Sequence, residues 1–184
     1  SSRPSSPKTK LKEIFLCLKK RNKQIRRQTA FITRAAIIAA LYVALTYLAN
    51  ALNLASGVIQ VRFSEALTIL PYFTSSAVPG LFLGCILSNW LTGCALWDVV
   101  FGSIATLIGA LITRLLRNKS KWLAPVAPII SNTVIVPFIL FYVYELPGTI
   151  PYFMATTFAG EFISCGILGM LLLTALQKHA KTIF

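Results

Sequence analysis

An arginine and two glutamates stand in apolar surroundings, where charge needs a chemical reason. Arg62 and Glu65 lie between two strongly apolar segments, and Glu161 lies inside a long apolar segment. A charge inside a bilayer costs at least about 2.5 kcal/mol on insertion scales, so such residues usually face a bundle interior, a partner or a ligand. We therefore expect a site here. Alternatively, Arg62 and Glu65 pair with each other and Glu161 is a protonated or salt-bridged structural residue.

Three further polar residues are candidates for the same site. Asn132 precedes Pro137, whose ring leaves the Thr133 carbonyl without its usual helical partner. An amide beside a freed carbonyl suits a polar ligand, although hydrogen bonding between helices would explain it as well. Asp98 begins a helical segment and is either an N-cap or a ligand contact. Asn89 lies near the far end of the preceding segment.

The usual signatures of enzyme chemistry are missing. The sequence has no G-x-x-x-x-G-K-[ST] phosphate loop, no H-E-x-x-H and no G-x-S-x-G. The four cysteines lack C-x-x-C spacing and are interpreted as packing residues, and His179 lies among terminal lysines. We expect no catalytic residue, no metal site and no cofactor.

Composition indicates an integral membrane protein. Hydrophobic residues make up 56% of the 184 residues, above the roughly 45–50% of soluble domains. The net charge is +13, but the basic residues concentrate before position 35, which argues against nucleic acid as the partner.

We predict a basic cytoplasmic extension over residues 1–28. Residues 1–10 are expected to be unstructured, and the rest of the extension is either solvated or lies on the inner membrane surface. Residues 29–184 are predicted to form one transmembrane domain, and no cleavable signal peptide is expected.

The elements that must position these residues are six helical segments, which predict an all-α bundle. They are expected at residues 29–51, 61–73, 78–96, 98–116, 123–144 and 150–177. The second would reach only about 20 Å as an α-helix, so it must be buried in protein, extended through the preceding loop or only partly spanning. The first carries small residues at helical spacing, which either pack inside the bundle or face another subunit: Ala35, Ala36, Ala39, Ala40 and Ala44.

The distribution of charge predicts the orientation. Cytoplasmic loops carry an excess of Lys and Arg, so the basic amino-terminal segment, the basic loop at 114–121 and the carboxyl end belong on one side. Both termini are therefore expected in the cytoplasm. Glu65, Asp98 and Glu145 then fall on the outer side, with Glu161 in the outer half to the middle of its helix.

Several runs resemble one family in order and spacing. They are Val61-Arg62-Phe63-Ser64-Glu65-Ala66-Leu67-Thr68-Ile69-Leu70-Pro71-Tyr72-Phe73, Pro79-Gly80-Leu81-Phe82-Leu83-Gly84-Cys85 and Asp98-Val99-Val100-Phe101-Gly102-Ser103. They resemble the QueT family of substrate-binding S components of energy-coupling factor (ECF) transporters. The resemblance implies a six-helix S component of a bacterial plasma-membrane importer, with a coupling subunit and an ATPase pair as partners. It also implies that the alanine-rich first helix contacts the coupling subunit, and that the ligand is a queuosine precursor.

The implied ligand, a 7-deazaguanine base in its aminomethyl or cyano form or queuine, gives these residues roles. Glu161 or Glu65 would accept from the N–H donors of the base, and Asn132 or Arg62 would donate to its ring carbonyl. Asp98 would meet a cationic aminomethyl group. Candidates for stacking on the ring are Phe63, Trp97 and Tyr152. The alternatives are an S component for another small vitamin-like solute and a proton-coupled carrier in which Glu161 and Glu65 form a relay.

Overall fold

The computed structural model describes residues 7–54 and 59–178, in which every regular element is a helix. Two compact units, Ser1–Thr33 and Arg34–Phe184, are described separately. The α-helices are α1 (Pro7–Ala51), α2 (Ala77–Leu91), α3 (Leu96–Leu116), α4 (Val126–Tyr142), α5 (Ile150–Glu161) and α6 (Met170–Gln177). Two 3-10 helices, η1 (Phe63–Tyr72) and η2 (Lys121–Leu123), and one π-helix, η3 (Phe162–Gly169), complete the order.

Four helical stretches among the described residues are long and apolar enough to cross a membrane. They are Phe15–Ala51, Leu96–Leu116, Lys121–Tyr142 and Ile150–Gln177. Ala77–Leu91 is apolar but shorter. The prediction of an all-α, multi-pass membrane protein is confirmed at this level, and the number of six crossings stays a prediction.

Helix α1 begins much earlier than the sequence predicts. Residues 7–10 already lie in this helix, so the expectation that they are unstructured is wrong. The side chains described between Phe15 and Thr33, in the first unit, are exposed. The expectations for residues 1–6 and for His179 concern positions outside the described residues.

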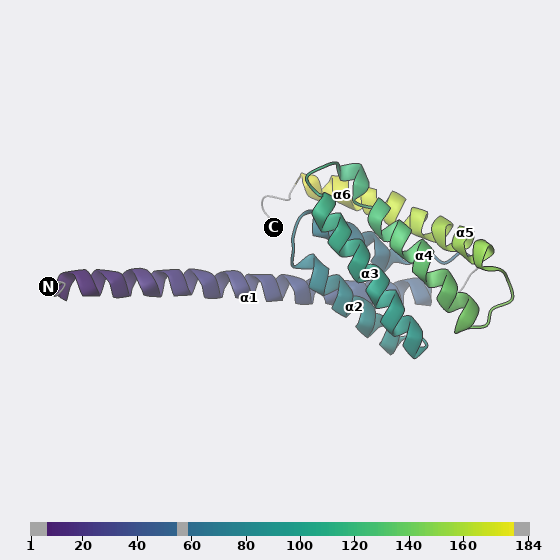
Figure 1. The fold of residues 1–184 in the computed structure, drawn as a ribbon, viewed down its shortest axis with the longest axis horizontal. Helices are drawn as coiled ribbons and strands as arrows, with labels where there is room; N and C mark the ends of the chain where they lie inside the picture. Colours follow the sequence, from purple (N-terminus) through teal and green to yellow (C-terminus); the bar gives the residue numbers. More distant parts are fainter. Residues whose placement is uncertain (1–6, 55–58, 179–184) are drawn as a thin grey trace, which may run out of the picture. The chain divides into compact units, whose positions relative to one another are not determined.

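In the second unit, long helices pack in sequence order. Helix α3 packs against both α2 and α4, and α4 packs against α5, as Figure 1 shows. The segment η1 contacts η3 and α3. Residues that are distant in the chain, at 60–65 and 161–165, are therefore brought together.

The alanines of α1 divide between two faces. Ala35 and Ala39 are buried, and they pack where Gly80 and Gly84 of α2 have no side chain. An ideal Cβ at Gly80 would lie 2.7 Å from the Ala35 carbonyl oxygen, so the two backbones are in close contact. The other three alanines at this spacing, Ala36, Ala40 and Ala44, are exposed. Internal packing therefore accounts for only part of the pattern.

The second segment is a 3-10 helix where the sequence predicts an α-helix. Its residues 64–71 are all buried, which agrees with the expectation that so short a segment must be covered by protein. Pro71 supplies no N–H donor inside the segment. The Glu65 carbonyl, in turn, accepts from the Thr68 hydroxyl at 2.6 Å, and Cys165 Sγ lies 3.4 Å from the same oxygen. Both features favour the tighter helix. At its far end, Arg114 Nη1 donates to the Pro71 carbonyl oxygen over 3.1 Å.

The last long segment is interrupted by a π-helix. The sequence predicts one continuous helix, but Phe162–Gly169 takes the wider turn between α5 and α6. Such segments are frequent at functional sites, because the extra residue per turn changes which side chains face inward. Here Ser164 and Cys165, just after Glu161, are buried.

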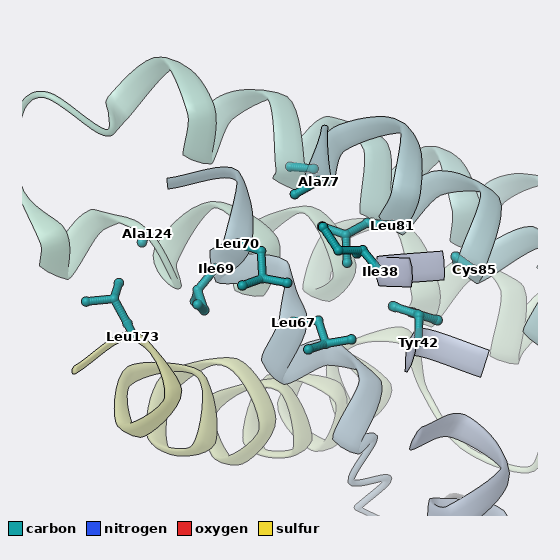
Figure 2. Packing of buried hydrophobic residues seen from close by; sticks show 11 residues of the cluster. Ile38, Tyr42, Leu67, Ile69, Leu70, Ala77, Leu81, Cys85, Ala124 and Leu173 are labelled. Carbon is teal, nitrogen blue, oxygen red and sulfur yellow. The ribbon is translucent and has the colours of Figure 1, made fainter. Parts of the chain in front are cut away.

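The hydrophobic core surrounds η1. Leu67, Ile69 and Leu70 of this segment pack with residues of α1, α2 and α6, which Figure 2 shows from close by. Tyr42 belongs to the same cluster and is almost fully buried. Its ring supports the core, while its hydroxyl reaches the polar site described next.

Candidate functional site

A cavity of about 270 Å³ lies among α3, α4, α5 and the start of η1. Its polar lining includes Arg62, Glu65, Asn132 and Glu161. Its remaining described lining is mainly apolar or uncharged: Gln60, Cys85, Gly102, Thr106, Val136, Leu140, Leu146, Pro147, Tyr152, Phe153, Thr156 and Thr157. A few convergent polar groups in an otherwise apolar cavity are typical of a small-molecule site.

Asn132 joins the two carboxyl groups at the polar end. Its Nδ2 donates to Glu161 Oε1 over 2.9 Å and lies 3.5 Å from Glu65 Oε2. The Tyr42 hydroxyl donates to the other oxygen of Glu65, Oε1. All four side chains are buried, so α1, η1, α4 and α5 meet in one hydrogen-bonded network. Such a network holds its members in a single arrangement, because each unpaired buried group would cost about 1–3 kcal/mol.

Cys165 extends this network through the π-helix. Its thiol lies 3.1 Å from Glu161 Oε2, as donor, and 3.3 Å from the Thr68 hydroxyl. Ligand atoms of Glu65, Glu161 and Cys165 lie within 4.8 Å of one another, so these three residues could hold a metal ion. The two glutamates already accept hydrogen bonds, from Asn132 in both cases and from Tyr42 in the case of Glu65, and this arrangement suits an organic ligand that replaces those bonds.

The segment that carries Arg62 is fixed against α5 and η3 by its backbone. The Arg62 N–H donates to Ser164 Oγ over 3.1 Å. Gly160, which directly precedes Glu161, leaves room for the Gln60 carbonyl oxygen. An ideal Cβ at Gly160 would lie only 2.1 Å from that oxygen. Only glycine permits this approach, so the position of Arg62 depends on it.

The Arg62 side chain lies among acids without a direct bond to them. No side chain in the described part of the chain makes a hydrogen bond or ion pair with its guanidinium, but the charges of Asp98 and Glu65 act on it. Burial acts to lower the pKa of Arg62, and these neighbouring charges outweigh it, so the pKa lies above its ordinary value. The guanidinium is thus a fixed positive charge that a ligand can meet.

A second cavity, of about 190 Å³, shares Gln60, Arg62 and part of the α4 wall with the first. It is lined by Asn89 and Asp98, which are both buried. The Tyr144 hydroxyl donates to Asp98 Oδ2 over 3.0 Å and accepts from the Ala95 N–H over 3.1 Å. Burial raises the pKa of Tyr144, and the Asp98 charge raises it further, so the phenol stays a donor.

The structure brings most of the predicted site residues together. Arg62, Glu65, Asn132 and Glu161 line the first cavity, and Asn89, Asp98 and again Arg62 line the second. Tyr152 lines the first cavity as well. The structure does not bring two aromatic candidates to either described lining. Trp97 is exposed and stacks on Phe101 with centroids 5.8 Å apart, and Phe63 is half-buried at the start of η1.

Some residues of the site cannot be predicted from the sequence, because their roles depend on contacts that form only in the folded protein. Tyr42 and Gln60 reach the site only through the packing of α1 and of the loop against other helices. The cysteine spacing predicts a packing residue at Cys165, whereas its thiol bonds Glu161. Its spacing of four residues after Glu161 was the available signal, since such side chains share a helix face.

Comparison with known proteins is consistent with a transporter. The family described as QueT transporter matches residues 32–178. The chain is also 34% identical over 97 residues to a protein of Lactococcus lactis subsp. cremoris (strain MG1363) named queuosine precursor transporter QueT. That match covers 52% of this chain and 56% of the relative, so the chain spans about half the length of the curated relative it matches. No solved structure matches the chain.

Proposed function

Since this chain belongs to the QueT transporter family, we propose that it binds a queuosine precursor, a 7-deazaguanine base, for import across the bacterial plasma membrane. The observation that carries this proposal is the buried arrangement in which Asn132 joins Glu65 and Glu161 at the end of a cavity. The relative named a queuosine precursor transporter supports the choice of ligand.

The polar end of the cavity complements the hydrogen-bonding edge of such a base. A guanine-like ring presents adjacent N–H donors, which a carboxylate accepts as a pair, and a carbonyl, which needs a donor. Glu161 or Glu65 supplies the carboxylate, and Asn132 or Arg62 supplies the donor. The uncharged walls, with Tyr152 and Phe153 among them, suit the faces of a planar ring. The base thus replaces the hydrogen bonds that these side chains make to one another.

We further propose that the second unit crosses the membrane six times with both termini in the cytoplasm. The four long helices account for most of the crossings, and α2 and the buried η1 supply the short ones. The positive-inside rule then directs the basic loop that follows α3 inward and places Asp98 and Glu145 outside. In this orientation Gln60 and Leu146, which line both cavities, lie toward the outer side.

The proposed role is that of the substrate-binding S component of an ECF importer, whose ATPase pair and coupling subunit are separate chains. The sequence has no phosphate loop of its own, which supports a separate motor. The coupling subunit would dock on α1, where Ala36, Ala40 and Ala44 form an exposed face of small residues at four-residue spacing. Ala35 and Ala39 lie behind that face, inside the fold.

Ligand binding to the purified chain tests the function directly. Titration calorimetry in detergent should detect tight binding of a 7-deazaguanine base without ATP. Absence of binding across the aminomethyl, cyano and queuine forms would overturn the proposal. Affinity purification from native membranes tests the partner assignment, because it should recover two ATPase subunits and a transmembrane protein.

A proton-coupled carrier is the second candidate. The observation that favours it is the pair of acids, Glu65 and Glu161, joined by a single amide inside the protein. In reconstituted vesicles, uptake that follows an imposed proton gradient without partner subunits would support the carrier. Uptake that requires the ATPase subunits and ATP would exclude it.

A further inference from the structure

The second cavity has a chemistry that the base-binding site does not use. We propose that Asp98, with Asn89 and Tyr144, forms a compartment for a protonated amine carried by the ligand, so that the protein selects a cationic deazaguanine over neutral ones. This inference rests on the proposed function, because it concerns a substituent of the same ligand.

The two cavities are arranged to hold one ligand. They share the lining residues Gln60, Arg62, Val136, Leu140 and Leu146. Gly102, one helical turn after Asp98, lines the first cavity. An ideal Cβ at Gly102 would lie 3.2 Å from Asp98 Oδ1 and 3.3 Å from Asn89 Nδ2. The missing side chain therefore leaves these two polar groups next to the first cavity.

Acidic side chains outnumber basic ones in the combined lining. The described residues that line the two cavities include three carboxyl groups, from Glu65, Asp98 and Glu161, and one guanidinium, from Arg62. The charges of Asp98 and Glu65 both act on the Arg62 guanidinium. A buried carboxylate is costly without a counter-charge. A ligand with a protonated amine can offer Asp98 a charged donor, and a neutral ligand cannot.

Asp98 is the carboxylate best placed to receive that charge. Glu65 and Glu161 already accept hydrogen bonds from Tyr42, Asn132 and Cys165 at the base-binding end. Asp98 is buried, with 6% of its surface exposed, and Tyr144 bonds its Oδ2. Its Oδ1 faces the position of Gly102. An ammonium donor at this oxygen would form a charge-assisted hydrogen bond, which is stronger than a neutral one.

A set of three ligands separates charge from shape. The 7-aminomethyl base is a cation at neutral pH, the 7-hydroxymethyl base is nearly the same size without charge, and the 7-cyano base is small and neutral. On the purified full chain, calorimetry should give the aminomethyl base an affinity about 10–100-fold higher than the hydroxymethyl base, as expected for a hydrogen bond between charged groups. This comparison needs no variant, so it is independent of any effect on folding.

Two variants locate the effect. Asp98→Asn keeps the size of the side chain and removes its charge, so it should bring the aminomethyl and hydroxymethyl affinities to within a few-fold of each other. Tyr144→Phe removes the hydrogen bond to Oδ2 but leaves the carboxylate, so it should retain the preference for the cation.

The outcomes distinguish this inference from the function on which it rests. If the wild-type chain binds none of the three bases and does not bind queuine, the proposed function fails. If it binds all three with similar affinity, or if Asp98→Asn keeps the full preference for the amine, the function stands and the amine compartment is refuted.

Discussion

Asn132 of α4 donates a hydrogen bond over 2.9 Å to Glu161 at the end of α5. Both side chains are buried, and the contact joins two long helices at the polar end of the first cavity. A ligand that enters this end must compete with that bond. The pair therefore connects the packing of the helices with the recognition of the ligand.

Replacing Glu161 by Gln should lower the affinity for a deazaguanine base about 10–100-fold, because the amide accepts with only one oxygen and loses a charge-assisted bond. Titration calorimetry measures the change. Glu145→Gln is the control, since Glu145 lies on an exposed loop outside both described linings, and it should bind like the wild type. Equal affinities of the two variants would remove Glu161 from the site.

Tyr42→Phe should destabilise the fold by about 1–3 kcal/mol, because Glu65 loses the donor to a buried carboxyl oxygen. Thermal unfolding in detergent measures this change. Tyr47→Phe provides the comparison, since the Tyr47 hydroxyl bonds the Leu91 carbonyl oxygen at an exposed position. Its unfolding temperature should change little, and a similar loss in both variants would contradict a special role for Tyr42.

Gly160→Ala should weaken ligand binding and cost about 1–3 kcal/mol of stability, because the added methyl group collides with the Gln60 carbonyl oxygen and displaces Arg62. Gly166→Ala in the same long segment is a suitable control. Its new methyl group would meet the movable ring of Phe162 at 3.3 Å rather than backbone. Titration calorimetry compares the ligand affinities of both variants. Unchanged affinity in Gly160→Ala would show that the segment carrying Gln60 and Arg62 can be displaced without loss of binding.

The two alanine faces of α1 should respond differently to a larger side chain. Ala39→Leu should destabilise the isolated protein, because Ala39 packs against Gly84 inside the fold. Ala40→Leu should leave ligand affinity unchanged but impair assembly with the coupling subunit. Thermal unfolding of the isolated chain measures its stability, and titration calorimetry measures its ligand affinity. Copurification with the partner subunits measures assembly. Normal assembly and uptake by Ala40→Leu would refute the proposed docking face.

Deleting residues 1–28 should leave ligand affinity unchanged. Every described side chain that lines the two cavities belongs to the unit Arg34–Phe184, and the family match begins at residue 32. Calorimetry on the shortened chain, with the full chain alongside, tests this expectation. A loss of affinity would show that the basic extension contributes to the binding unit.

Local sequence rules predict the helices and the charged candidates well. Arg62, Glu65 and Glu161 stand out because charge is costly in apolar surroundings, and the structure gathers all three at one cavity. Pattern alone did not predict the 3-10 form of η1 or the π-helix at Phe162–Gly169. Both depend on which side chains satisfy particular backbone groups, and that is decided by tertiary contacts.

The aromatic candidates show the same limit. Trp97 and Phe63 have the right chemistry for stacking on a base, but the direction in which each ring points depends on the rotation of its helix. Trp97 faces outward beside Phe101, where an apolar ring suits lipid as well as it suits a ligand. Composition cannot separate these two environments.

The buried η1 segment joins the binding site to the opposite side of the second unit. Glu65 near its start belongs to the ligand network, and the Pro71 carbonyl at its end accepts a hydrogen bond from Arg114, next to the basic loop. A ten-residue 3-10 helix rises about 20 Å. Its residues 64–71 are all buried. If the proposed orientation holds, we expect ligand binding at Glu65 to change the stability of the contact between Arg114 and Pro71 at the proposed cytoplasmic side.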